Sequence, residues 1–175
     1  MRTLEISART LLVVVFAVAV YGKASNKRSY LAFEHSLRQM SLAPPVLVTT
    51  IAKATIAAEA VVVCLLLIPT RWCGVAGFMV ATGLLAAMTG VIGMNIGKKN
   101  RAPCNCFGAS DAELGVQHIL RNLGLAATAV LGATATLMAL GAADLASGML
   151  AAATGLVIGS LIVFLEDLIA LFARG

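Results

Sequence analysis

The chain has 175 residues, of which 60% are hydrophobic and only 12% are charged. An average soluble domain has about 25% charged residues, so this composition excludes an ordinary water-soluble protein and indicates a multi-pass protein of the cell membrane, surrounded by the lipid bilayer. The net charge of +5 does not indicate nucleic-acid binding, because the basic residues are spread over short segments that flank apolar runs. We interpret them as topology signals and expect no nucleic-acid partner.

Five apolar runs are long enough to cross a bilayer, which takes about 20 helical residues. They cover residues 4–21, 46–68, 72–96, 116–140 and 147–172. The first run is the least regular, because it contains Arg9, and no small-residue cleavage pattern follows it, so we expect an uncleaved helix. The predicted fold class is all-α: a single transmembrane helical domain over residues 1–175, with four to five spans.

The connection between the first two runs contains a further predicted helix. Over residues 29–42, apolar positions recur at helical spacing beside charged positions, which is typical of an amphipathic helix on the membrane surface. Pro44 and Pro45 should end this helix and start the second span, since proline is tolerated at a helix beginning but not in its interior. A tight turn at residues 69–71 then predicts that the second and third spans are antiparallel neighbours.

Two pairs of glycines have the four-residue spacing that lets helix backbones approach closely. They are Gly93 with Gly97 and Gly155 with Gly159. The spacing also arises by chance in a chain with 16 glycines, so the pairs give weak support for helix contacts.

One feature of the chain is typical of a chemical site, the Cys104-Asn105-Cys106 sequence in a polar loop over residues 97–113. Residues two apart can form a disulfide only where the chain bends, so such a bridge should be strained and easily reduced, which suits thiol exchange. Nearby positive charge favours the thiolate, the reactive form of cysteine. Three basic residues precede the pair: Lys98, Lys99 and Arg101.

Other interpretations of the cysteines are open at this point. Cys104 and Cys106 can be two inert apolar residues, or two ligands of a metal with His118 as a third. We favour a redox pair without a metal. Cys64 and Cys73 should lie at the opposite membrane face, as packing residues or as a structural disulfide.

Polar residues within the predicted spans indicate a buried polar region. His118, Arg121 and Asn122 share one helix face by their spacing and should face the bundle interior. Lys53 and Glu59 lie in the second span, where each needs a partner or water. Helix counting places Glu59 within reach of Arg121, which predicts a buried ion pair; alternatively, these groups form a polar pocket that holds a quinone head or relays protons.

Several of these motifs resemble the MauE family of methylamine-utilisation proteins, within the wider DoxX-like group. The similarity covers residues 10–140. Its most specific part is the sequence Pro103-Cys104-Asn105-Cys106-Phe107-Gly108-Ala109, followed by Arg121-Asn122-Leu123; weaker matches are Val20-Tyr21-Gly22-Lys23, Pro44-Pro45 and the membrane-embedded Glu59. The chain departs from the family at Asn105, where glycine is more frequent.

The resemblance implies a function in the maturation of the disulfide-rich small subunit of methylamine dehydrogenase. The layout is similar to membrane thiol oxidoreductases of the vitamin K epoxide reductase and DsbB kinds, which implies Cys104 and Cys106 as the redox pair, Arg121 and Asn122 as a supporting pocket, and a quinone as electron acceptor. Those oxidoreductases carry a second cysteine pair, and residues 22–45 contain none. A thioredoxin-like partner or the client protein would have to replace it.

Two indications about membrane orientation disagree. The side with the cysteine loop carries most of the lysines and arginines, so the positive-inside rule places it in the cytoplasm. Disulfide formation places it outside, where disulfides persist. We favour the outer side, because charges on a surface helix can also serve lipid headgroups.

Two functions fit the sequence. The first is a membrane thiol–disulfide redox protein acting through Cys104 and Cys106. The second is a non-catalytic anchor or assembly subunit of a larger membrane complex, or of a homo-oligomer, with the cysteine loop as a docking element. A transporter is disfavoured, because no inverted repeat is found.

Overall fold

The computed structural model describes the backbone of residues 1–40, 44–97, 116–138 and 144–172 and, apart from Pro45 and residues 165–172, their side chains. Within these ranges all regular secondary structure is α-helical. The helices are α1 (Arg2–Ala24), α2 (Lys27–Gln39), α3 (Pro45–Leu67), α4 (Arg71–Gly97), α5 (Val116–Met138) and α6 (Leu145–Phe172).

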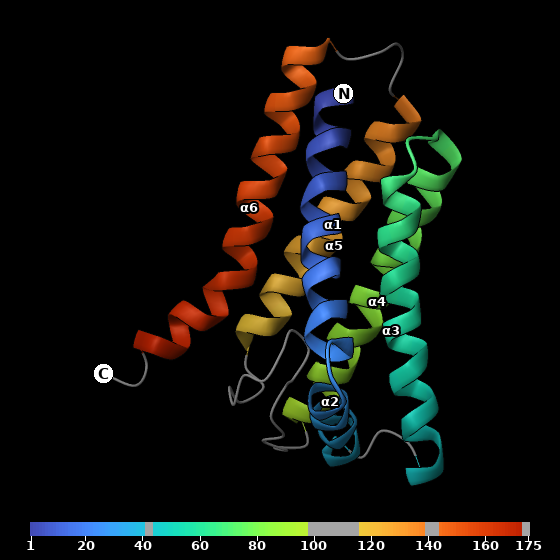
Figure 1. Cartoon of the computed structure of the whole chain (residues 1–175), viewed down its shortest axis with the longest axis vertical. Helices are drawn as coiled ribbons and strands as arrows, with labels where there is room; N and C mark the ends of the chain where they lie inside the picture. Colours follow the sequence, from blue (N-terminus) through green and yellow to red (C-terminus); the bar gives the residue numbers. More distant parts are fainter. Residues whose placement is uncertain (41–43, 98–115, 139–143, 173–175) are drawn as a thin grey trace.

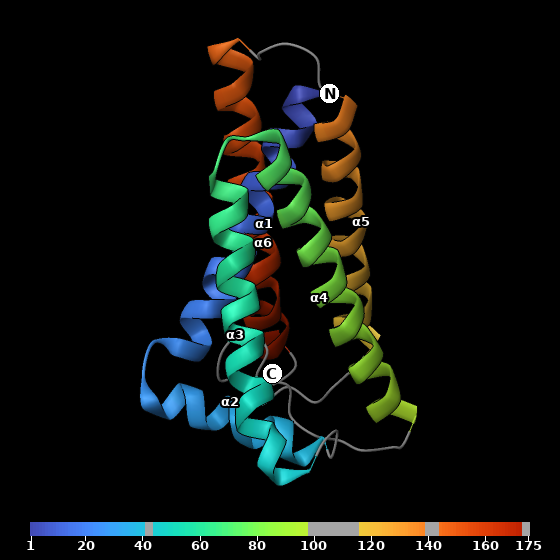
Figure 2. The same ribbon diagram turned by 90° about the vertical axis from the view of Figure 1, so that its right-hand side faces the viewer.

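All helices except α2 are long and apolar enough to cross a membrane. The predicted all-α fold with up to five spans is therefore confirmed, and the segment that contains Arg9 is one of the five. The surface helix is also confirmed, although it begins at Lys27, two residues before the predicted start. In Figures 1 and 2, α2 lies across the lower end of the bundle, whereas the N-terminus lies at the upper end.

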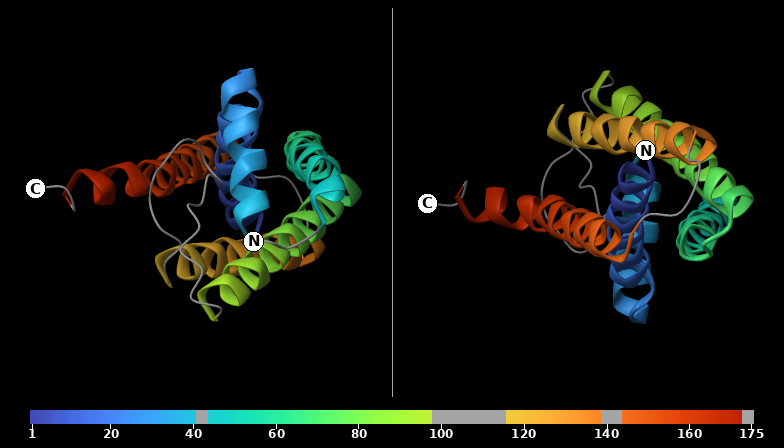
Figure 3. Two further views of the ribbon diagram at one scale, coloured as in Figure 1. Left: turned by 90° about the horizontal axis from the view of Figure 1, so that it is seen from below. Right: turned by 90° about the horizontal axis from the view of Figure 1, so that it is seen from above.

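The first helix lies at the centre of the arrangement, because α1 contacts α3, α5 and α6 along its length and α2 at its end. On the side of α1 opposite α6, α3 packs against α4 and α4 packs against α5. The views along the long axis in Figure 3 show α6 beside α1, on the outer side of the bundle. The predicted antiparallel pairing of the second and third spans is present as α3 and α4 (Figure 1).

The apolar core is built where α1, α3, α4 and α5 meet. Its largest fully enclosed members are Leu12, Phe78 and Leu125, each with almost no exposed surface. Many other large apolar side chains point outward, as expected for helices whose solvent is lipid.

One of the two glycine pairs makes the predicted helix contact. A Cβ atom added to Gly155 would lie 2.3 Å from the backbone oxygen of Ser7, and one added to Gly159 would lie 3.0 Å from that of Leu11, so glycine lets α6 lie directly on α1. A Cβ atom at Gly93 or Gly97 would meet none of the described residues within 4 Å, so the prediction of a helix contact is wrong for that pair in the described part of the chain.

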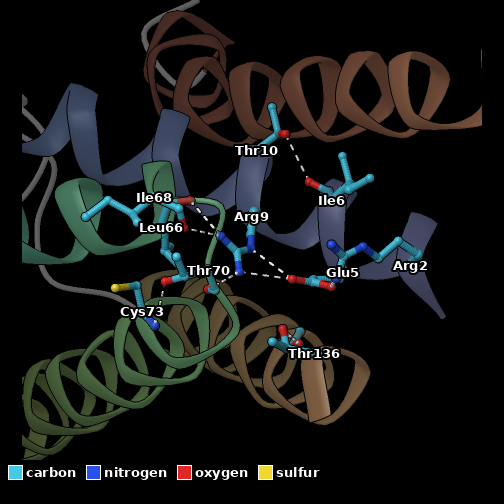
Figure 4. Close-up of polar contacts among 11 residues, drawn as sticks. Arg2, Glu5, Ile6, Arg9, Thr10, Leu66, Ile68, Thr70, Cys73 and Thr136 are labelled. Carbon is cyan, nitrogen blue, oxygen red and sulfur yellow. Dashed lines mark hydrogen bonds and ion pairs between the residues drawn. The ribbon is translucent and has the colours of Figure 1, made fainter. Parts of the chain in front are cut away.

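The polar contacts of Arg9 explain how this charged residue is accommodated in the first span (Figure 4). Its guanidinium forms an ion pair with Glu5, one turn earlier on α1, at 2.9 Å. It also donates hydrogen bonds to three carbonyl oxygens at the C-terminal end of α3 and in the turn that follows it. These are the carbonyls of Leu66 at 3.2 Å, Ile68 at 2.8 Å and Thr70 at 3.2 Å.

Candidate functional site

The structure describes both helix ends that flank the cysteine loop. The C-terminal end of α4, at Gly97, and the N-terminal end of α5, at Val116, lie at the end of the bundle where α2 lies (Figure 1). The predicted redox pair and its basic neighbours are outside the described residues: Cys104, Cys106, Lys98, Lys99 and Arg101. The candidate site is therefore built from the buried groups at this end of the helices.

The central feature is an ion pair between Lys23, in the last turn of α1, and Glu59 of α3. Their side chains are only 1% and 2% exposed, so both charges lie in the interior, where an unpaired charge is very costly. The ammonium group of Lys23 donates to Oε1 of Glu59, whereas Oε2 of the same carboxylate is buried without a hydrogen-bond partner. This oxygen can accept a proton or a hydrogen bond from a group that approaches it.

The surface helix closes over this ion pair. Nζ of Lys23 lies 5.1 Å from the ring centre of Phe33 in α2, a cation–π geometry, and the Phe33 side chain is itself buried. The pair thus joins three helices, because Lys23 comes from α1, Glu59 from α3 and Phe33 from α2.

A second polar contact fixes α2 to α3. Glu34 accepts hydrogen bonds from Arg38 of its own helix at 2.5 Å and from Thr49 of α3 at 3.0 Å. These bonds, with the nearby charge of Lys53, hold the pKa of the Glu34 carboxyl below its ordinary value. The carboxylate is therefore the form that attaches the surface helix to the bundle.

The polar residues predicted on α5 lie at the same end of the molecule. His118 and Asn122 are each only 2% exposed and Arg121 is half-buried, which agrees with a polar face directed inward. Oδ1 of Asn122 is buried without a hydrogen-bond partner. In the last turns of α4, Asn95 is equally buried and donates to the carbonyl of Val91 at 2.9 Å.

Two sequence predictions about the charged groups are wrong. Glu59 pairs with Lys23 and not with Arg121, because α1, rather than α5, is the helix that lies against this part of α3. Lys53, which was expected to be a buried polar residue with a partner or water, lies on the exposed face of α3.

Sequence reasoning missed Lys23 and Asn95 as site residues. A lysine at the end of a span usually extends to the membrane interface, and this expectation concealed the burial of Lys23. The sign available beforehand was its position in the Val20-Tyr21-Gly22-Lys23 motif that carries the family resemblance. Asn95 gave a weaker sign, as the single amide in a long apolar run.

The two cysteines outside the loop do not form a disulfide. Cys64 is exposed and Cys73 is half-buried, and both are free thiols. The alternative of a structural disulfide is therefore wrong, and Cys64 faces outward rather than into the core. Within the described residues, no group of three His, Cys, Asp or Glu side chains is placed to hold a metal ion.

Comparison with protein families identifies the chain. A family model described as methylamine utilisation protein MauE matches residues 1–135, which is most of the sequence. The chain belongs to the MauE family. Neither a curated protein nor a solved structure matches it.

The match covers the whole candidate site of this MauE-family chain. Lys23, Glu59 and Asn122 lie within residues 1–135, as do Cys104 and Cys106, whereas α6 begins after the match ends. The part common to the family is thus the bundle of α1 to α5, up to the last turn of α5.

Proposed function

We propose that this protein is a membrane thiol–disulfide redox protein of the cell membrane, in which Cys104 and Cys106 form the redox pair. Its client is a disulfide-containing protein needed for methylamine utilisation, reached directly or through a thioredoxin-like partner. The family description supports the metabolic context, and the paired cysteines in a polar loop support the chemistry.

The proposed reaction is an exchange that balances electrons and protons. A thiolate of the client or partner attacks the Cys104–Cys106 disulfide and gives a mixed disulfide. The second thiolate of the client then displaces this bond, so the client is oxidised to a disulfide and the cysteine pair is reduced to two thiols. A membrane quinone accepts the two electrons and two protons and restores the disulfide.

The observation that carries the proposal is the position of the buried Lys23–Glu59 pair. Lys23 is in the last turn of α1, which ends toward the side of the bundle where α4 stops and α5 starts, and it pairs with Glu59 in the interior of α3. The helices α4 and α5 flank the cysteine loop. Thiol oxidation releases protons, and a buried carboxylate with one oxygen lacking a partner is a suitable acceptor. We assign Glu59 this role and Lys23 that of holding it in place.

A labelling experiment tests the redox pair. A membrane-impermeant maleimide is added to intact cells before and after reduction, and the modified cysteines are mapped by mass spectrometry. Cys104 and Cys106 should react only after reduction, and labelling in intact cells would place their loop on the outer side. Full labelling before reduction, in cells that oxidise the client normally, would contradict a stored disulfide.

Cysteine variants test whether the pair is needed. Cys104→Ser and Cys106→Ser should each abolish oxidation of the client, and one of them should trap a mixed disulfide. Cys64→Ser and Cys73→Ser are matched controls, because both are free thiols outside the loop, and should leave oxidation unchanged. Normal oxidation in both loop variants, with a partner that still co-purifies, would instead support the non-catalytic assembly subunit.

A further inference from the structure

An apolar cavity lies under the surface helix, on the side of α2 that faces α4. Its volume is about 180 Å³, and residues of α2, α3 and α4 line it. The main packing of α2 is against α1 and α3, and the cavity lies between α2 and α4. An apolar cavity of about 150 Å³ in a protein interior stays dry and can bind benzene, so this one is large enough for part of a hydrocarbon chain.

The lining carries no polar group directed at a ligand. Ser36 and Thr55 are the polar members, and each hydroxyl donates to a carbonyl of its own helix: Ser36 to Phe33 at 2.8 Å and Thr55 to Ile51 at 2.9 Å. The other lining residues are Phe33, Leu37, Met40, Ile51, Leu84, Ala87, Met88, Val91 and Ile92. The two hydroxyl donors are already used within their own helices, so a ring with carbonyl oxygens would lack a hydrogen-bond donor here, whereas an acyl chain needs none.

The exposed face of the surface helix is positively charged. On α2, Lys27, Arg28 and Arg38 are exposed. The one acidic residue of α2, Glu34, forms an ion pair with Arg38 and also lies close to the charge of Lys53. Exposed basic side chains on an amphipathic helix at the membrane surface attract anionic headgroups.

We propose that this cavity is a binding site for an anionic membrane lipid. One acyl chain occupies the space between α2, α3 and α4, and the headgroup lies against the basic side chains of α2. The lipid would fill the gap beside Phe33, the residue that covers Lys23, and would hold the surface helix in place. This site is separate from the proposed cysteine chemistry and does not depend on it.

Phosphatidylglycerol and phosphatidylcholine with the same acyl chains are the probes. Each is titrated into the delipidated full-length protein in detergent, and bound lipid is counted by native mass spectrometry. Phosphatidylglycerol should bind more tightly, and added salt should weaken its binding. Equal affinity for the two lipids would overturn the proposal.

Two substitutions locate the site. Ala87→Phe places a ring in the cavity and should weaken phosphatidylglycerol binding about tenfold. Ala86→Phe is the matched control, since Ala86 is exposed on the same helix but does not line the cavity, and it should leave binding unchanged. Equal binding by the Ala87→Phe and Ala86→Phe proteins would overturn the assignment.

A photolabelling experiment on the unmodified protein does not depend on how variants fold. Phosphatidylglycerol with a diazirine in its acyl chain should label peptides from the Phe33 to Met40 part of α2 and the Leu84 to Ile92 part of α4. Labelling confined to other helices would overturn the proposal, as would a co-purified quinone that Ala87→Phe displaces while lipid binding stays unchanged.

Discussion

Lys23 at the end of α1 and Glu59 in α3 form an ion pair whose two side chains are almost fully enclosed. Each charge is tolerated in the interior because the other neutralises it. Lys23→Met should therefore destabilise the protein by about 3–5 kcal/mol, because the Glu59 carboxylate stays behind without a partner. Glu59→Gln should have a similar effect through the uncompensated ammonium group.

The double variant separates pairing from packing. Lys23→Met combined with Glu59→Gln removes both charges, so its loss of stability should be well below the sum of the two single losses. Reversible unfolding in mixed detergent micelles, followed by circular dichroism, measures all three proteins. Additive losses would show that the two residues do not act as a pair.

Arg9 should be sensitive even to replacement by lysine. Lysine keeps the charge near Glu5 but lacks the planar fork that reaches three carbonyl oxygens at once, so Arg9→Lys should cost about 2 kcal/mol. Arg2→Lys is the control, because Arg2 is more exposed and forms an ion pair with the same carboxylate of Glu5. The same unfolding assay applies, and equal small losses in both variants would contradict the role of the carbonyl bonds.

The contact between α6 and α1 depends on glycine. Gly155→Ala places a Cβ atom 2.3 Å from the Ser7 backbone oxygen, so the helices must separate, at a cost of about 1–3 kcal/mol. Gly93→Ala has open space around it and should leave stability unchanged or slightly improved. Limited proteolysis of α6 in nanodiscs reports the separation. Matching proteolysis rates in the two variants would show that the close approach is not required.

Acid should loosen the surface helix. The pKa of Glu34 is lowered in the folded protein, so its contribution to stability is fully present above the pKa of the unfolded chain. It is lost as the pH falls through the lower, folded pKa, when protonation removes the ion pair with Arg38. The protection factors of α2 amides, which correct for the intrinsic pH dependence of exchange, should therefore fall on acidification below the ordinary carboxyl range. In Glu34→Gln the protection factors should be lower at neutral pH and should not change further with acid; a wild-type response in this variant would contradict the assignment.

The features that the sequence predicts depend on local composition, whereas those that it does not predict depend on how the helices pack. Span positions follow from local composition, so the helices were predictable to within a few residues, as was the amphipathic α2. Ion-pair partners depend on which helices touch and how they are rotated, and neither is encoded locally. Glu59 was correctly expected to need a partner, but the choice of Lys23 over Arg121 follows from the packing of α1 on α3. The same reasoning explains why Gly155 makes a helix contact whereas Gly93 does not.

The Glu5–Arg9 contact also bears on how the protein enters the membrane during synthesis. The two residues are one turn apart on α1, so the charge of Arg9 can be matched before α3 has been synthesised. Once α3 and the turn after it are in place, the remaining N–H groups of the guanidinium donate to their carbonyl oxygens. A side chain of α1 thus binds the connection of the α3–α4 hairpin, which is synthesised later.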